Sequence, residues 1–208
     1  MKTMAAALVV SSAALRSVRS VHPHKALIRT MNQSFSSAAA NIPPSLADLC
    51  DEHIASPQRL QVVTPNLFSS YGKLPSFHGQ IETVRCFESN PMVRTTLSSP
   101  GNNRVLVVDG GGSTRVAILG DQIAKLAVEN QWAGIIINGC IRDSAIINTL
   151  NIGVKALGTH PVKSLKMYPG ECSVTVNFGG VEFIPGQYVY SDEDGIIVSK
   201  EPLHISKL

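Results

Sequence analysis

Two short segments carry residue types that suit chemistry on an anionic molecule. They are Gly120-Asp121-Gln122-Ile123 and Gly139-Cys140-Ile141-Arg142-Asp143. If the strand that enters the second segment runs antiparallel to the helix that leaves the first, Asp121 meets Arg142 and Asp143 at one edge of a sheet. That edge then holds two carboxylates, one guanidinium and the free N–H groups of a helix start. Such a group of side chains is able to hold a divalent cation and an anionic organic molecule together.

The elements that must position these residues are visible in the pattern of apolar residues. A helix over 121–130 and an apolar strand over 135–138 would each span about 15 Å, so the two segments return to the same level. Arg142 then follows a strand at the point where ligands collect in open α/β sheets. A fully apolar stretch at 105–108 indicates a buried neighbouring strand.

The rest of the chain predicts one α/β domain with a mixed sheet over about 45–203. The C-terminal third is β, with Gly179-Gly180 as the turn of a hairpin. Expected helices lie at 46–54, 91–97, 121–130 and 144–150, and expected strands lie at 61–64, 80–84, 105–108, 116–119, 135–138, 154–157, 174–178, 181–184, 187–190 and 196–199.

The carboxylates of Asp121 and Asp143 supply hard oxygen ligands, which Mg²⁺ and Mn²⁺ prefer. Two carboxylates are too few for a cage made only of protein, which fits a cation that keeps some waters and exchanges others for substrate. Arg142 suits bidentate binding of a substrate carboxylate. The structural alternative is a surface ion pair in which Asp143 caps the next helix.

Other candidate residues have weaker patterns. The Asp109-Gly110-Gly111-Gly112-Ser113 loop lacks the Gly-Lys-Ser/Thr of a Walker loop, and Arg115 stands where a dinucleotide loop needs its third glycine. The loop fits a methyltransferase only loosely, and we expect its glycines to serve a tight turn near the ligand of Asp121. The remaining candidates we read as structural or solvent-exposed, with the cysteines free and mostly buried; they are His53, His78, His160, His204, Lys125, Lys155, Lys163, Lys166, Cys50, Cys86, Cys140 and Cys172.

The net charge of +3 is set by the N-terminal segment. Residues 1–47 contain five basic and no acidic residues, whereas the remaining residues hold 13 basic against 15 acidic ones. We therefore expect no nucleic-acid partner, and no apolar run is long enough to predict a membrane span. Residues 1–44 resemble an organelle presequence, while the final Ser206-Lys207-Leu208 is a peroxisomal address. The two signals compete, so localisation stays open between peroxisome and mitochondrion or plastid.

Four segments taken together resemble the RraA-like family, in its plant-type branch of 4-hydroxy-4-methyl-2-oxoglutarate aldolases. They are Val107 to Ser113, Leu119-Gly120-Asp121, Gly139 to Asp143, and Tyr190 to Ile196. The resemblance covers residues 46–203. It implies a ββα swivelling-type fold in a single mixed-sheet domain, assembled as a homotrimer with sites at subunit boundaries.

The resemblance also implies roles for individual residues. Gly120, Asp121, Gln122 and Ile123 would bind the substrate carboxylate, Arg142 would bind substrate, Asp143 would hold Mg²⁺ or Mn²⁺, and Asp121 would orient a water on that metal. Some bacterial members add an acid from a neighbouring subunit's C-terminal extension. This chain ends soon after its last expected strand, so that acid has no assigned position here.

The implied activity is class II cleavage of 4-hydroxy-4-methyl-2-oxoglutarate to two pyruvates, without a Schiff base. Oxaloacetate decarboxylation would use the same pyruvate enolate. The alternatives are a non-catalytic protein-binding regulator, as for family members that inhibit a ribonuclease, an inactive structural trimer, or, with less support, a methyltransferase. A pure binding surface has no need for the Arg142-Asp143 pair beside Gly120-Asp121, so the residues favour the enzyme.

Overall fold

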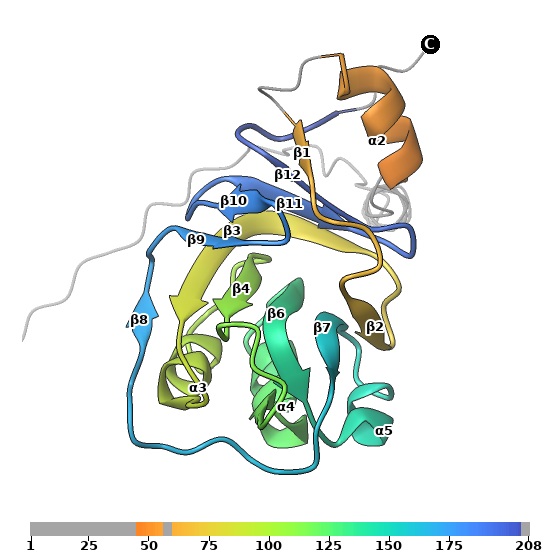
Figure 1. Ribbon diagram of the computed structural model, residues 1–208. Coiled ribbons are helices and arrows are strands. Elements are labelled where there is room, and N and C mark those ends of the chain that lie inside the picture. The colour runs from red at the N-terminus through yellow and green to blue at the C-terminus, as the bar shows by residue number, and fades with distance from the viewer. Residues whose placement is uncertain (1–44, 56–59, 205–208) are drawn as a thin grey trace, which may run out of the picture. The chain divides into compact units, whose positions relative to one another are not determined.

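The computed structural model describes residues 45–55 and 60–204 (Figure 1). The presequence-like segment 1–44 and the C-terminal Ser206-Lys207-Leu208 lie outside these residues. None of the helices in the described ranges is long and apolar enough to cross a bilayer. The first expected helix is present as α2, Leu46–His53, with Ser45 at its N-cap and Asp48 in its first turn.

The centre of the structure is a mixed sheet with the strand order β1-β12-β11-β3-β4-β6-β7-β2, where β5 also pairs with β6 and β8 with β3. A separate hairpin, β9 and β10, turns at Gly179-Gly180 as the sequence predicts. The strands are β1 Leu60–Val62, β2 Ser69–Gly72, β3 Phe77–Arg85, β4 Val105–Asp109, β5 Ala117–Leu119, β6 Gly134–Ile141, β7 Gly153–Thr159, β8 Glu171–Cys172, β9 Val176–Phe178, β10 Val181–Phe183, β11 Tyr188–Ser191 and β12 Ile196–Ser199.

Strand β3 joins two differently built halves of the sheet. Residues 77–80 pair antiparallel with β11, whereas residues 81–85 pair parallel with β4. The parallel half continues through β4, β6 and β7. The antiparallel half ends where β12 pairs with β1. Parallel strands need crossover connections, which here carry the helices, and antiparallel strands need only turns.

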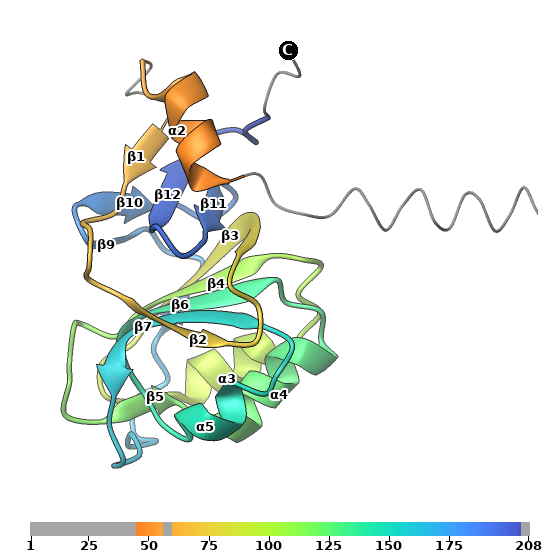
Figure 2. The same ribbon diagram turned by 90° about the vertical axis from the view of Figure 1, so that its right-hand side faces the viewer.

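Helices cover one face of the parallel half. Figure 2 shows α3 (Pro91–Leu97), α4 (Asp121–Glu129) and α5 (Ser144–Ile147) together on the same side of β4, β6 and β7. Strand β4 alternates as a strand between two layers must: Leu106 and Val108 pack among the helices, and Val105 and Val107 pack against the C-terminal strands. All four side chains are fully buried, so the expected buried strand is confirmed.

An aromatic ring on β3 lies across two glycines of the parallel sheet. Gly134 and Gly153 are register partners on β6 and β7. A Cβ atom built at either position would lie 2.1 or 2.2 Å from the Phe77 ring. The two glycines therefore leave the space that this buried ring fills, and no larger residue fits there without displacing it.

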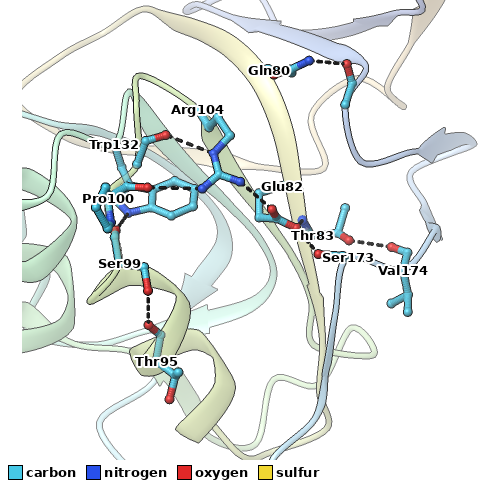
Figure 3. A network of polar contacts seen from close by, with 12 residues as sticks. Gln80, Glu82, Thr83, Thr95, Ser99, Pro100, Arg104, Trp132, Ser173 and Val174 are labelled. Carbon is cyan, nitrogen blue, oxygen red and sulfur yellow. Dashed lines mark hydrogen bonds and ion pairs between the residues drawn. The ribbon is translucent and has the colours of Figure 1, made fainter.

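A polar network ties β3 to the start of β4 (Figure 3). The Arg104 guanidinium pairs with Glu82 at 2.5 Å and lies 4.9 Å from the centre of the Trp132 ring. The Trp132 indole N–H donates to the Ser99 carbonyl at 3.1 Å. The Ser173 hydroxyl donates to Glu82 as well, so this carboxylate joins β3 to the connection between β8 and β9.

Several expected boundaries are wrong. Strand β6 runs from Gly134 to Ile141, longer than the expected 135–138, because Cys140 and Ile141 pair with both β5 and β7. Helix α5 ends at Ile147, three residues before the expected end. Strand β3 begins at Phe77 rather than at residue 80, and β2 was not expected because its Ser-Ser-Tyr-Gly sequence has no apolar pattern.

Candidate functional site

The two key segments meet because each follows one of two paired strands. Strands β5 and β6 run parallel, with Leu119 and Ile141 as register partners near their ends. The next residues are Gly120 and Arg142, and the Arg142 N–H donates to the Leu119 carbonyl at 2.9 Å. The helix of the first segment, α4, begins directly at Asp121. The expected meeting of the Gly-Asp and Arg-Asp segments at one sheet edge is confirmed.

Gly120 packs directly against the Arg142-Asp143 pair. A Cβ atom at this position would lie 2.9 Å from Asp143 Oδ2 and 3.2 Å from Arg142 Nε. The backbone of Gly120 is extended, with φ −131° and ψ 177°, so the conformation itself is open to any residue. What requires glycine here is the close approach of the guanidinium and carboxylate groups.

Arg142 and Asp143 form an ion pair that leaves room for a ligand. Arg142 Nε lies 3.3 Å from Asp143 Oδ2, and the two side chains are 38% and 36% exposed. Asp143 adopts the left-handed conformation, with φ 56°, at the N-cap position of α5. Its side chain makes no capping hydrogen bond, although its carbonyl accepts the N–H groups of Ile146 and Ile147. The carboxylate thus pairs with Arg142 rather than capping α5.

Asp121 has a cationic partner that was not expected from the sequence. Lys125, one turn later on α4, donates to Asp121 Oδ2 at 2.9 Å. This hydrogen bond is the largest cause that lowers the pKa of Asp121. Burial, the next largest effect, opposes it, and the charge of Lys125, the N–H of Gln122 and the charge of Arg142 lower the pKa further. Asp121 is therefore ionised at neutral pH and able to accept a proton or orient water.

The N–H groups at the start of α4 are not all free. Ile123 donates to the Gly120 carbonyl at 3.1 Å, so its N–H is already used. The N–H groups of Gly120 and Asp121 have no acceptor within the described ranges, as expected of the first donors of a helix. The anion-binding donors of this turn are thus fewer than the four-residue segment suggests.

A cleft of about 220 Å³ opens beside these groups. It is lined from the expected site by Gly120, Asp121, Gln122, Ile123 and Arg142, while Asp143 contacts Gly120 without lining the cleft itself. Five further lining residues were not assigned from the sequence, since none belongs to a recognisable motif: Asn90, Arg94, Lys163, Ser164 and Lys166. Ala117 completes the wall.

The glycine loop after β4 closes on itself. The Asp109 carboxylate accepts the Gly111 N–H and the Asn138 side-chain amide, both at 2.9 Å. Gly111 and Gly112 have positive φ angles of 68°, so the expected tight turn is confirmed. The expectation that the loop contacts the ligand of Asp121 is not met, because residues 109–113 do not line the cleft.

Lys155 is buried, contrary to the expectation that it would be solvated. It is 3% exposed, and burial lowers its pKa. Its ammonium group donates to the Ser70 hydroxyl at 2.8 Å and to the Asp192 carbonyl at 2.6 Å, which joins β7 to β2 and to the loop after β11. These bonds and the absence of Lys155 from the cleft lining give it a structural role.

Cys86 and Cys140 are buried as expected, whereas Cys50 is partly exposed and Cys172 is exposed. Burial raises the pKa of Cys140, so a reactive thiolate is not formed there, and no disulfide joins the described cysteines. His78 stacks on Tyr190 with ring centres 5.5 Å apart. The described residues contain no group of three or more His, Cys, Asp or Glu side chains arranged to hold a metal.

Comparison with known proteins identifies the family. The RraA-like family model, described as Aldolase/RraA, matches residues 46–198. A protein of Aromatoleum aromaticum named "Putative 4-hydroxy-4-methyl-2-oxoglutarate aldolase" is 54% identical over 157 residues, which cover 76% of this chain and 96% of that protein. A Hahella chejuensis protein of the same name is 52% identical over 156 residues, covering 75% and 93% of the two chains.

Two solved structures show the same fold. The structure of an S-adenosylmethionine:2-dimethylmenaquinone methyltransferase from Geobacillus kaustophilus is 48% identical, with a TM-score of 0.73, over 79% of this chain and 100% of that one. The RNA-processing inhibitor RraA from Thermus thermophilis is 38% identical, with a TM-score of 0.72, over 77% and 95%. The expected mixed-sheet α/β fold is thus confirmed as that of RraA proteins, and the chain belongs to the RraA-like family.

Proposed function

We propose that this protein is a divalent-metal-dependent aldolase that cleaves 4-hydroxy-4-methyl-2-oxoglutarate to two molecules of pyruvate. Decarboxylation of oxaloacetate would be a side activity of the same site. The observation that carries the proposal is the packing of Gly120 against Arg142 and Asp143, next to an ionised Asp121 in one cleft. The names of the relatives at about 50% identity support the same substrate.

The residues fit Mg²⁺ or Mn²⁺ held mainly by Asp143. Its side chain is 36% exposed, is not used as a helix cap, and packs against Gly120 at the edge of the cleft. A cation that keeps several waters and binds one or two carboxylates needs no larger cluster. When bound, the cation would supply Lewis acidity toward the 2-keto group of the substrate.

The chain's own groups perform the remaining tasks. Arg142 binds the carboxylate next to the keto group and offsets the negative charge of the pyruvate enolate that forms when the carbon–carbon bond breaks. The N–H groups of Gly120 and Asp121 at the helix start would donate to the same carboxylate. Asp121 would orient a water that accepts the proton of the substrate's hydroxyl group. Loss of CO₂ from oxaloacetate gives the same enolate.

The proposal is tested by pyruvate release from both substrates by the full chain. We expect release in the presence of Mg²⁺ or Mn²⁺, loss of release in EDTA, and loss in Asp143→Ala. Release that is unaffected by EDTA and by this substitution would refute a metal site at Asp143. The thermal stability of the variant provides the folding control, since the Asp143 side chain makes no capping bond.

A protein-binding role is the second candidate, because large apolar side chains are exposed near the cleft. They are Phe87, Val162, Leu165, Met167 and Tyr168, each more than half exposed. We propose that they contact other copies of this chain in a homotrimer, which light scattering on the purified protein would test. A monomer that binds a ribonuclease through these residues, with no pyruvate release, would favour the regulator instead.

A methyltransferase is disfavoured by the glycine loop, although a structure at 48% identity carries that title. Asp109, the acid at the end of β4, already uses its Oδ1 atom to accept from Gly111 and Asn138, which leaves one carboxylate oxygen for a ribose. Calorimetry with S-adenosylmethionine would test this directly, and we expect no binding.

A further inference from the structure

The cleft carries more positive charge than one carboxylate requires. Arg94 on α3 and Lys163 and Lys166, from the segment after β7, line the cleft together with Arg142. No ion pair joins Arg94, Lys163 or Lys166 to any carboxylate in the part of the chain that the structure describes. Asp121, the one acidic residue in the lining, is already paired with Lys125. The cleft is therefore suited to a ligand with more than one negative charge.

A buried hydroxyl group without a partner lies among these cations. Ser164 lines the cleft and is only 5% exposed. Its Oγ atom has no hydrogen-bond partner among the described residues. Buried polar groups in native structures almost always have partners, so an orphan hydroxyl in a ligand cleft points to a partner that arrives with the ligand.

The segment that carries these side chains is fixed at its backbone. Ser164 donates its N–H to the Ala117 carbonyl at 3.0 Å, and Ala117 donates to the Val162 carbonyl at 2.8 Å. The Leu165 N–H donates to the Glu88 carbonyl at 3.0 Å. These bonds hold the segment against β5, the strand that leads into Gly120. The two lysines are thus attached to the same framework as the Arg142 side of the cleft.

We propose that Arg94, Lys163, Lys166 and Ser164 form a second subsite, which binds the distal carboxylate of a dicarboxylic 2-keto acid. The proposal rests on the proposed function, in which Arg142 and the start of α4 bind the first carboxylate. The cations would attract the distal carboxylate, and the Ser164 hydroxyl would donate to one of its oxygens. Selection for a dicarboxylic substrate over a monocarboxylic one of equal length follows from this division.

The test is a pair of non-cleavable ligands that differ only at the distal end. 2-Oxoglutarate has a terminal carboxylate where 2-oxopentanoate has a methyl group. Calorimetry on the full chain with Mn²⁺ should give a dissociation constant roughly tenfold or more lower for 2-oxoglutarate. In the double variant Lys163→Met/Lys166→Met this preference should fall to within about threefold, chiefly through weaker 2-oxoglutarate binding.

Two further variants test whether the preference for 2-oxoglutarate comes from the subsite residues or only from the overall charge of the protein. The double variant Lys73→Met/Lys200→Met removes an equal charge from two exposed lysines outside the cleft and should keep the full preference. Ser164→Ala should lower the preference without lowering the melting temperature, since its hydroxyl has no protein partner to lose. A wild-type protein without the preference, or a Lys163→Met/Lys166→Met variant that retains it, would overturn the subsite.

Hydrogen exchange at the methyl group of pyruvate distinguishes failure of the subsite from failure of the proposed function. Pyruvate has no distal carboxylate, yet its exchange in D₂O passes through the same enolate. Exchange by the wild-type protein without a preference for 2-oxoglutarate would leave the aldolase proposal intact and refute the subsite. A preference for 2-oxoglutarate in the wild-type protein that the Lys163→Met/Lys166→Met variant loses would support the subsite. If the same wild-type protein did not exchange the methyl hydrogens of pyruvate, that result would count against the aldolase chemistry and not against the subsite.

Discussion

Replacing Gly120 with alanine tests the contact on which the candidate site depends. The new Cβ atom would lie 2.9 Å from Asp143 Oδ2 and 3.2 Å from Arg142 Nε. To restore ordinary van der Waals contact, the carboxylate must move by about 0.5 Å. Because the Gly120 backbone is extended, alanine adds no conformational strain. The substitution therefore displaces two functional groups and little else.

The expected cost to activity is larger than the cost to stability. A misplacement of about 1 Å at a reacting centre lowers rates by about 100-fold, so a shift of half that size at both groups should lower kcat/KM by about ten- to 100-fold. The displaced atoms are the ends of partly exposed side chains, so unfolding should be easier by no more than about 1 kcal/mol, or a few degrees in melting temperature.

The assay is pyruvate release from 4-hydroxy-4-methyl-2-oxoglutarate with saturating Mg²⁺, measured beside thermal unfolding. Gly158→Ala is the matched control, because this glycine lies on β7 and a Cβ atom there would meet nothing within 4 Å. We expect the control to retain activity and stability. Full activity in Gly120→Ala, or an equal loss in both variants, would refute the reasoning that Arg142 and Asp143 act from their observed positions.

Three other substitutions give separate readouts. Arg142→Lys should lower kcat/KM by about two to three orders of magnitude while leaving the melting temperature unchanged, since lysine cannot form the bidentate contact; near-normal activity would contradict its role. Lys125→Met should raise the pKa of Asp121 toward its ordinary value of about 3.9, so that the carboxylate is lost at higher pH on acidification; a ¹³C NMR titration of the carboxyl carbon showing no shift would contradict this. Gly134→Ala should destabilise the fold by about 3 kcal/mol in denaturant titrations, because the Phe77 ring must move; an unchanged midpoint would contradict the packing.

The central part of the site was predictable because it follows from local patterns. An apolar strand that ends in Arg142-Asp143, and a helix that starts at Gly120-Asp121, are each visible within ten residues of sequence. Their meeting required only that strand and helix have similar lengths. The three-residue β5, which places both segments side by side, was also expected from its apolar residues, as a strand over 116–119.

The cationic side of the cleft was not predictable, for a physical reason. Lys163, Ser164 and Lys166 lie in a connection held by isolated bridges to Ala117 and Ser89 rather than by a regular element. Such bridges pair residues far apart in the chain, and no period in the sequence reports them. Strand β2 was not expected for the same reason. It is a polar edge strand that is defined only by its pairing with β7, and its sequence has no apolar period.

The pairing of β1 with β12 has a consequence for how the protein is made. Leu60 and Ser199 are partners across this pair, so β1, the first strand of the described chain, can pair only after β12 has been synthesised. The parallel half, by contrast, is built from neighbours in sequence between Val105 and Thr159. On the ribosome, the strands that carry the Gly120 and Arg142 segments therefore have their partners early, while β1 remains an unpaired edge until β12 has been synthesised.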